Sequence, residues 1–263
     1  MSRETFLRAF GTDKAVIGMV HLKPLPGAPN YGGDIEEIYR CARLDLERLT
    51  EGGITAAIVE NFGDVPYQAE ISQSTVVAMA ILIDRLRRES RIPLGVNVQY
   101  NCTEAEWDIA SMTGCQFIRV EAFVENRVGS HGITWAAAPA LMRRKAQFPS
   151  DVLLLADLNV KHTFPLVDQP MSFTVHEAKD AGADALIVTG MQTGSAPSLE
   201  DIREMRALAG DTPVLIGSGI TEANIKESLS VADGVIVGSS IKEAGNVWNP
   251  VETERVRKLV AAV

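Results

Sequence analysis

The chain has 263 residues, of which 46% are hydrophobic and 22% charged, so it can form a large folded core and a disordered chain is excluded. Its formal net charge is -9 and it has no basic stripe, which excludes a nucleic-acid partner. Three cysteines without CxxC spacing exclude a disulfide framework and a cysteine-built metal cluster. Because there is no signal peptide and no apolar run of roughly 20 residues, we expect a cytoplasmic protein without a transmembrane segment.

Short apolar runs, most of them rich in β-branched residues, recur along the chain and predict buried parallel strands. In chain order these runs are 16–20, 56–59, 94–98, 117–120, 152–156, 185–188, 214–216 and 235–237. Amphipathic segments between the runs predict helices. Three residue pairs mark helix starts with the spacing of a capping box, namely Asp34 with Glu37, Thr103 with Glu106, and Ser198 with Asp201.

This strand–helix alternation predicts the α/β class and, within it, a (β/α)8 TIM barrel. A doubly wound open sheet is the alternative, but no GxGxxG follows the first strand, and eight units are what a closed barrel requires. The sequence shows no linker or break in composition, so we expect residues 1–263 to form one domain.

Polar residues end at least six of the predicted strands, after apolar starts and on one side-chain parity. They are His21, Lys23, Glu60, Asn97, Gln99, Arg119, Glu121, Asp157, Asn159 and Thr189. In a barrel this parity faces inward at the C-terminal mouth, where active sites are built. Burying so many polar groups without a use is costly, so the pattern predicts an active site at the mouth.

Glycine and serine follow the last two predicted strands, in the turns Gly217-Ser218-Gly219 and Gly238-Ser239. Glycine lets backbone N–H groups approach an anion, and a helix that starts after such a turn adds a favourable dipole. Barrel enzymes that bind phosphate use the loops after strands seven and eight. The paired turns therefore predict a phosphate site, and the ligand is expected to be a phosphorylated small molecule.

Long motifs of the chain resemble the BtpA/SgcQ family. They lie at 18–27, 59–67 and 156–162, with the turn at 216–219, and the resemblance extends from about Val16 to Ile241. It implies a barrel of the ribulose-phosphate-binding type. One branch of the family is named for a role in photosystem I biogenesis, and another is a sugar-operon enzyme. The resemblance thus implies a fold and a rough site, without an established reaction.

The first functional hypothesis is an enzyme that acts on a phosphorylated sugar or a ribosyl compound. Asp157 or Glu60 would be the general base, with its pKa raised by burial beside Glu121. His21 would transfer protons, and Lys161 or Lys23 would stabilise an enolate or form a Schiff base. The residues expected to bind substrate are Asn97, Arg119, Asn159, Thr189 and Lys23. Isomerisation, aldol cleavage and N-glycosidic cleavage all stay open.

Two further alternatives are open. Glu60, Glu121 and Asp157 with His21 would suit a divalent metal such as Mg²⁺ or Mn²⁺. The second functional hypothesis is a non-enzymatic assembly or regulatory factor that uses the barrel as a scaffold. The charged mouth favours the enzyme, because a scaffold gains nothing from converging charges. A homo-oligomer is compatible with the sequence, which indicates no interface.

Overall fold

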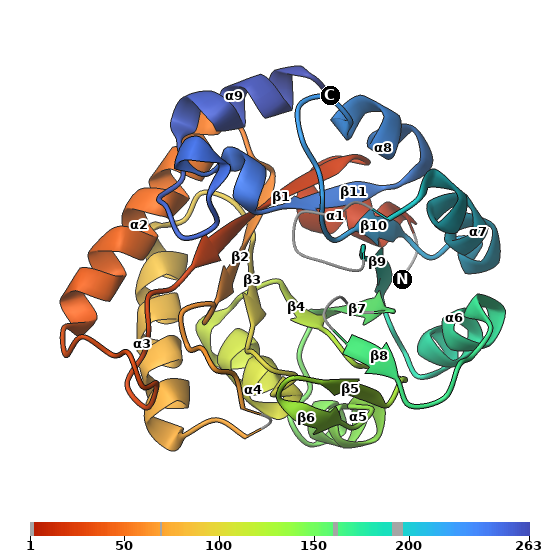
Figure 1. Cartoon of the computed structure of the whole chain (residues 1–263), viewed down its shortest axis with the longest axis horizontal. Coiled ribbons are helices and arrows are strands. Elements are labelled where there is room, and N and C mark those ends of the chain that lie inside the picture. Colours follow the sequence, from red (N-terminus) through yellow and green to blue (C-terminus); the bar gives the residue numbers. More distant parts are fainter. Residues whose placement is uncertain (1–2, 69, 160–162, 191–196) are drawn as a thin grey trace.

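The computed structural model describes residues 3–68, 70–159, 163–190 and 197–263. Eight parallel strands close into a barrel in the order β1-β11-β10-β9-β7-β4-β3-β2, with helices around the outside (Figure 1). The strands are β1 (Ala15–His21), β2 (Ala56–Glu60), β3 (Leu94–Asn97), β4 (Phe117–Val120), β7 (Leu153–Leu158), β9 (Ala185–Val188), β10 (Val214–Ile216) and β11 (Gly234–Val237). Every predicted strand is thus confirmed, and its ends differ from the predicted ends by at most two residues.

Helices alternate with the strands as the periodicity predicts, except α1, which precedes the first strand. They are α1 (Arg3–Phe10), α2 (Ile35–Gly52), α3 (Gln73–Glu89), α4 (Thr103–Thr113), α5 (Ala138–Gln147), α6 (Met171–Asp180), α7 (Leu199–Ala209), α8 (Ile225–Val231) and α9 (Thr253–Ala261). Two short 3-10 helices, η1 (Ser239–Ile241) and η2 (Glu243–Gly245), come between β11 and α9. In the described parts of the chain, no helix is long and apolar enough to cross a membrane.

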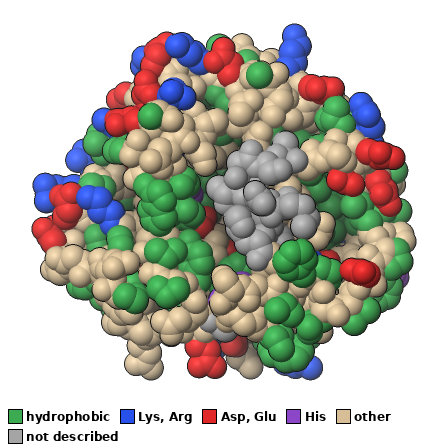
Figure 2. All heavy atoms as spheres, in the orientation of Figure 1, with side chains coloured by type: hydrophobic (Ala, Val, Ile, Leu, Met, Phe, Trp, Pro, Cys, Tyr) green, Lys and Arg blue, Asp and Glu red, His purple; other side chains and the backbone are tan. Residues whose placement is uncertain are grey.

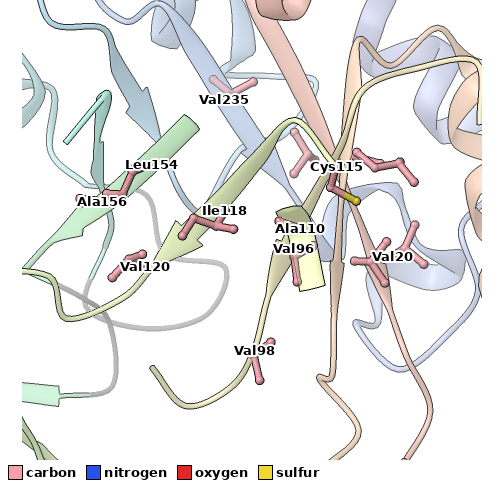
Figure 3. Packing of buried hydrophobic residues seen from close by; sticks show 14 of the residues in the cluster. Val20, Val96, Val98, Ala110, Cys115, Ile118, Val120, Leu154, Ala156 and Val235 are labelled. Carbon is pink, nitrogen blue, oxygen red and sulfur yellow. The ribbon is translucent and has the colours of Figure 1, made fainter. Parts of the chain in front are cut away.

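Alternation of side chains divides the apolar residues of the strands into two layers. One parity fills the barrel interior, with Ile17, Ile58 and Phe117 among its members. The other parity belongs to a cluster that also contains buried residues of the surrounding helices, and Figure 3 shows Val96, Ile118 and Leu154 among its members. The polar strand ends identified from the sequence continue the interior parity, so most of them lie at the mouth.

Helix α1 precedes the first strand and closes the floor of the barrel. Its Phe6 and Phe10 are buried in the interior cluster, with ring centroids 4.6 Å apart, and the Phe10 ring lies 5.3 Å from that of Phe117. The sequence analysis did not predict this helix. Its effect is to keep water from the lower half of the barrel, so the mouth is the polar end of an otherwise apolar interior.

Two of the three predicted helix caps are confirmed. Asp34 Oδ1 accepts a hydrogen bond from the Glu37 N–H at 2.9 Å, and Ser198 Oγ accepts one from the Asp201 N–H at 3.0 Å. Helix α4 does start at Thr103, as predicted, but the capping box expected there does not form, because Cys102 occupies the N-cap position and makes no side-chain cap. Glu106 is instead fully buried against the end of β3, so it belongs to the site and not to a capping box.

A small antiparallel sheet of order β6-β5-β8 was also missed. It consists of β5 (Arg127–Gly129), β6 (Gly132–Thr134) and β8 (Thr163–Pro165), which lie in loops after β4 and β7. Each strand has three residues, too few for the alternation of apolar and polar residues to be recognised. Buried Arg127 ties two of these loops together, because its guanidinium donates to Thr163 Oγ1 at 2.6 Å and to Asn159 Oδ1 at 3.1 Å.

Candidate active site at the barrel mouth

A cavity of about 290 Å³ lies at the C-terminal ends of β1, β2, β10 and β11. Its lining is Met19, His21, Glu60, Phe62, Arg119, Gly217, Ser218, Gly219, Ile220, Thr221, Ile236, Gly238, Ser239, Ser240, Gly245 and Val247. Eight of the residues that the sequence analysis proposed are among them. The structure therefore brings the two Gly-Ser turns together with a glutamate, an arginine and a histidine.

Both Gly-Ser turns line the cavity, and glycine in the first of them is required by the backbone and by close neighbours. Gly219 has φ +75°, in the left-handed region where a side chain would be strained. A Cβ on Gly217 would lie 2.6 Å from the γ-methyl groups of Ile187 and Thr189 and 3.2 Å from Arg119 Nη2, so this position has no room for a side chain. Ser218 Oγ accepts a hydrogen bond from the Gly190 N–H at 3.1 Å, which connects this turn to the end of β9.

A bidentate ion pair lies beneath the cavity. Arg119 Nε donates to Asp157 Oδ1 at 3.0 Å and Nη2 donates to Oδ2 at 2.8 Å, and both side chains are buried. Burial disfavours the charge on the guanidinium, but pairing with Asp157 raises the pKa of Arg119 above its ordinary value. The arginine is therefore charged, and its fork is fixed in orientation by a carboxylate.

Two further carboxyl groups share one amide. Asn97 Nδ2 donates to Glu121 Oε1 at 2.9 Å and to Glu106 Oε1 at 3.0 Å, while the Val98 N–H donates to Glu106 Oε1 at 2.6 Å. Among the described residues, neither Glu106 Oε2 nor Glu121 Oε2 has a hydrogen-bond partner. A buried carboxylate oxygen without a donor is unfavourable, which favours a proton on this pair.

Electrostatics agrees with that inference. Burial raises the pKa of Glu121 to about 8, against the lowering effects of Asn97 and Arg119. Burial, and after it the charge of Glu121, also raises the pKa of Glu106 well above its usual range. Two carboxyl groups in one dry site cannot both ionise cheaply, so at neutral pH the pair holds at least one proton.

The remaining polar groups hold the rim of the mouth. Glu60 is buried and accepts a hydrogen bond from Gln99 Nε2 at 2.9 Å. The His21 ring stacks on Phe62, with centroids 4.3 Å apart and planes 20° apart. Phe62 in turn contacts Trp248, with centroids 4.7 Å apart. Histidine and a carboxylate thus face the cavity from adjacent strands β1 and β2.

Other residues expected at the site lie beside the cavity or away from it. Asn159 and Thr189 join the ends of β7 and β9, because Thr189 Oγ1 donates to the Asn159 carbonyl at 3.1 Å. Lys23 lies on the outside of the barrel, where Nζ donates to Glu37 Oε1 of α2 at 2.9 Å and the side chain is half exposed. Its backbone has left β1, so the strand parity no longer directs it inward. Lys161 lies outside the described residues.

The described residues do not form a metal centre. Within them no three His, Cys, Asp or Glu side chains are grouped closely enough to hold an ion. Both oxygens of Asp157 are held by Arg119, and Glu121 is held by Asn97. The set of Glu60, Glu121, Asp157 and His21 that the sequence suggested therefore does not fit Mg²⁺ or Mn²⁺, and no step is assigned to a metal.

The eight parallel strands, with helices around them and a cavity between the turns after β10 and β11, form a (β/α)8 barrel. Two solved structures share this fold: KGPDC from Streptococcus mutans (TM-score 0.59, 10% identity, covering 95% of this chain and 96% of that one) and N-(5'-phosphoribosyl)anthranilate isomerase from Pyrococcus furiosus (TM-score 0.55, 16% identity, covering 94% and 98%). At such identities the likeness shows the fold alone.

The chain belongs to the BtpA family, which matches residues 12–263. It is 37% identical over 258 residues to the photosystem I biogenesis protein BtpA of Synechocystis, covering 97% of this chain and 90% of that protein. The resemblance stated from the sequence motifs is therefore confirmed.

Proposed function

We propose that this protein is an enzyme that acts on a phosphorylated sugar or ribosyl compound at the barrel mouth. The observation that carries the proposal is the shared cavity, in which two Gly-Ser turns face the same space as Glu60, His21 and Arg119. The turns would hold the phosphate through Gly217, Ser218, Gly219, Gly238 and Ser239, with the guanidinium nearby to complement the negative charge. The reacting part of the ligand would then lie over the carboxyl groups.

Each side chain at the mouth has a role that its geometry suits. Glu60 would act as the general base, because it lines the cavity and is oriented by Gln99. His21 would transfer a proton at the adjacent strand. Asp157 suits a positioning role better than that of a base, since it is fully buried and both its oxygens are bound to Arg119.

Glu121 would supply a proton to the site from beneath the cavity, whose lining it does not join. Its raised pKa keeps a proton available at neutral pH, as a general acid requires, and Asn97 fixes its orientation. A base that lines the cavity and a protonated carboxyl group beneath it would suit proton transfer beside a carbonyl. Isomerisation and aldol cleavage both include such a step, and the proposal extends to that step only.

The names of proteins with this fold support the ligand class. The isomerase from Pyrococcus furiosus has a phosphoribosyl group in its name, and it matches 94% of this chain in structure. Cytoplasmic location, organisation as one domain and self-association stay predictions.

Ligand-induced stabilisation tests the proposal. Ribose 5-phosphate, ribulose 5-phosphate and inorganic phosphate would be added during thermal unfolding of the wild type, Ser218→Asp and Ser239→Asp. At a hundredfold excess over Kd, a ligand stabilises the folded state by about 2.7 kcal/mol. We expect a sugar phosphate to stabilise the wild type and neither variant, because an added carboxylate repels phosphate. Ser230→Asp is the matched control on the exposed side of α8 and should respond like the wild type.

A second candidate is an assembly factor, which the name of the Synechocystis relative favours. If none of these compounds stabilises the wild type, the enzyme proposal is contradicted and this candidate takes its place. The buried charges at the mouth speak against it, since a surface for protein docking has no use for a carboxyl pair that is almost fully buried.

A further inference from the structure

We propose that a second cavity beside the mouth binds a planar heteroaromatic ring, so that the ligand is a ribosyl phosphate that carries such a ring. This inference rests on the proposed function for the phosphate end of the ligand. It adds a second binding subsite, for which Trp248 provides the stacking surface.

The second cavity measures about 330 Å³ and adjoins the first. His21, Phe62 and Val247 line both cavities, so the stacked pair of His21 and Phe62 forms part of the wall between them. A ligand held by its phosphate at the turns after β10 and β11 can therefore extend past this pair into the second cavity. The distance between the subsites is bridged by a sugar, which presents its reacting carbons to the mouth.

The lining of the second cavity suits an aromatic ring. Phe62, Trp248 and Pro250 provide flat apolar surfaces, and Leu22, Pro24 and Leu44 complete the apolar wall. Trp248 leaves 60% of its surface exposed, although it contacts Phe62 with ring centroids 4.7 Å apart. Figure 2 shows hydrophobic side chains gathered near the middle of the mouth side, whereas most charged side chains lie toward its edge. An exposed indole beside a cavity is a stacking surface that a heteroaromatic ring can cover.

The segment that carries Trp248 is held in place before any ligand binds. Lys242 Nζ donates to Asp45 Oδ2 at 2.8 Å, and the Val251 N–H donates to Asp45 Oδ1 at 2.8 Å. Lys242 and Asp45 are both buried. The Asp45 carboxylate on α2 thus binds both ends of the segment, which are also paired with each other. The backbone N–H of Trp248 also donates to Asn246 Oδ1 at 3.1 Å. A wall fixed in this way costs little ordering when a ring docks on it.

The polar end of the cavity explains why the ring should be heteroaromatic. Lys23 lines the cavity with a half-exposed ammonium that is paired with Glu37 and lies beside the Cys41 thiol. A ring nitrogen or an exocyclic carbonyl can accept a hydrogen bond from this ammonium, whereas a hydrocarbon ring cannot. The sequence analysis expected Lys23 to bind substrate, and the second cavity gives that residue a place to do so.

Binding of matched probes tests the inference. Affinities of adenosine 5'-monophosphate, uridine 5'-monophosphate and ribose 5-phosphate would be measured by calorimetry for the wild type, Trp248→Ala and Trp135→Ala. We expect at least one nucleotide to bind the wild type about tenfold more tightly than ribose 5-phosphate, which corresponds to about 1.4 kcal/mol. Trp248→Ala should abolish this advantage and leave the affinity for ribose 5-phosphate unchanged. Trp135 is the control, because it is a tryptophan of similar exposure, 65%, in another part of the chain.

The outcomes separate this inference from the proposed function. If ribose 5-phosphate binds but no nucleotide binds more tightly, the aromatic subsite is overturned and the phosphate site stands. If the nucleotide advantage survives in Trp248→Ala, the ring lies elsewhere and the inference is likewise overturned. If none of the three compounds binds, the proposed function itself is contradicted, and with it the inference that rests on it. The chain has three tryptophans, so quenching by the nucleotide would be measured in Trp135→Phe and in Trp135→Phe with Trp248→Ala, which keep buried Trp107; quenching in the first variant alone would place the ring at Trp248.

Discussion

Replacing Glu121 with glutamine should change how the stability of the protein depends on pH. The pKa of Glu121 rises from its ordinary 4.5 to about 8 in the folded chain. Between these values the folded state holds a proton that the unfolded chain has released, so the free energy of unfolding falls as pH rises through this window. The slope for one proton is at most about 1.4 kcal/mol per pH unit. The full pKa shift would correspond to a loss of roughly 5 kcal/mol in the free energy of unfolding. Relaxation of the protein and penetration of water reduce this loss to roughly 2 kcal/mol.

Urea unfolding at a series of pH values from about 5 to about 8 measures this effect, since the window between the two pKa values of Glu121 covers that range. Glutamine can still accept from Asn97 but cannot ionise, so Glu121→Gln should flatten the profile and be more stable than the wild type at the upper end. Glu204→Gln, at an exposed site on α7, should keep the profile of the wild type. If Glu121→Gln and the wild type lose stability in parallel as pH rises, the shared-proton interpretation of the carboxyl pair is refuted.

Two other substitutions test the barrel interior. Asp157→Asn should destabilise the fold by about 3 kcal/mol in urea unfolding, because Arg119 stays charged and buried without its bidentate partner; a loss under about 1 kcal/mol would show that nearby carboxylates compensate. Gly95→Ala should cost about 1–3 kcal/mol, since a Cβ there would overlap the buried ring of Phe117. Gly32→Ala, where a Cβ meets open space, is its control, and equal stability of the two variants would contradict the packing argument.

The barrel was predictable from the sequence because its signals are local and repeated. Runs of β-branched residues with a fixed parity mark each strand, and that parity correctly placed Glu60, Asn97, Arg119 and Asp157 on the inside. The Gly-Ser turns were predictable for the same reason, since their position after the seventh and eighth strands is visible in the chain. Features that depend only on strand order and side-chain alternation can therefore be predicted from the sequence.

The role of Glu106 was not predictable in this way. Three residues after Thr103 it has the spacing of a capping box, and only the contacts with Asn97 and Val98 turn it inward. Those contacts depend on how β3 ends beside α4. Phe62 and Trp248 were missed for a similar reason, because they come together from loops 186 positions apart, although Phe62 lies in a motif that the family resemblance had already singled out.

Because helix α1 closes one end of the barrel, the interior opens to solvent only at the mouth. With Phe6 and Phe10 filling the base of the barrel, the substrate and product of the proposed reaction must pass through the same opening, and so must every proton exchanged between the Glu106–Glu121 pair and water. Product that lingers at the mouth would therefore both block the next substrate and isolate the acid from solvent. Inhibition by product and slow reprotonation should accordingly appear together in the kinetics, and a change at the rim should relieve both.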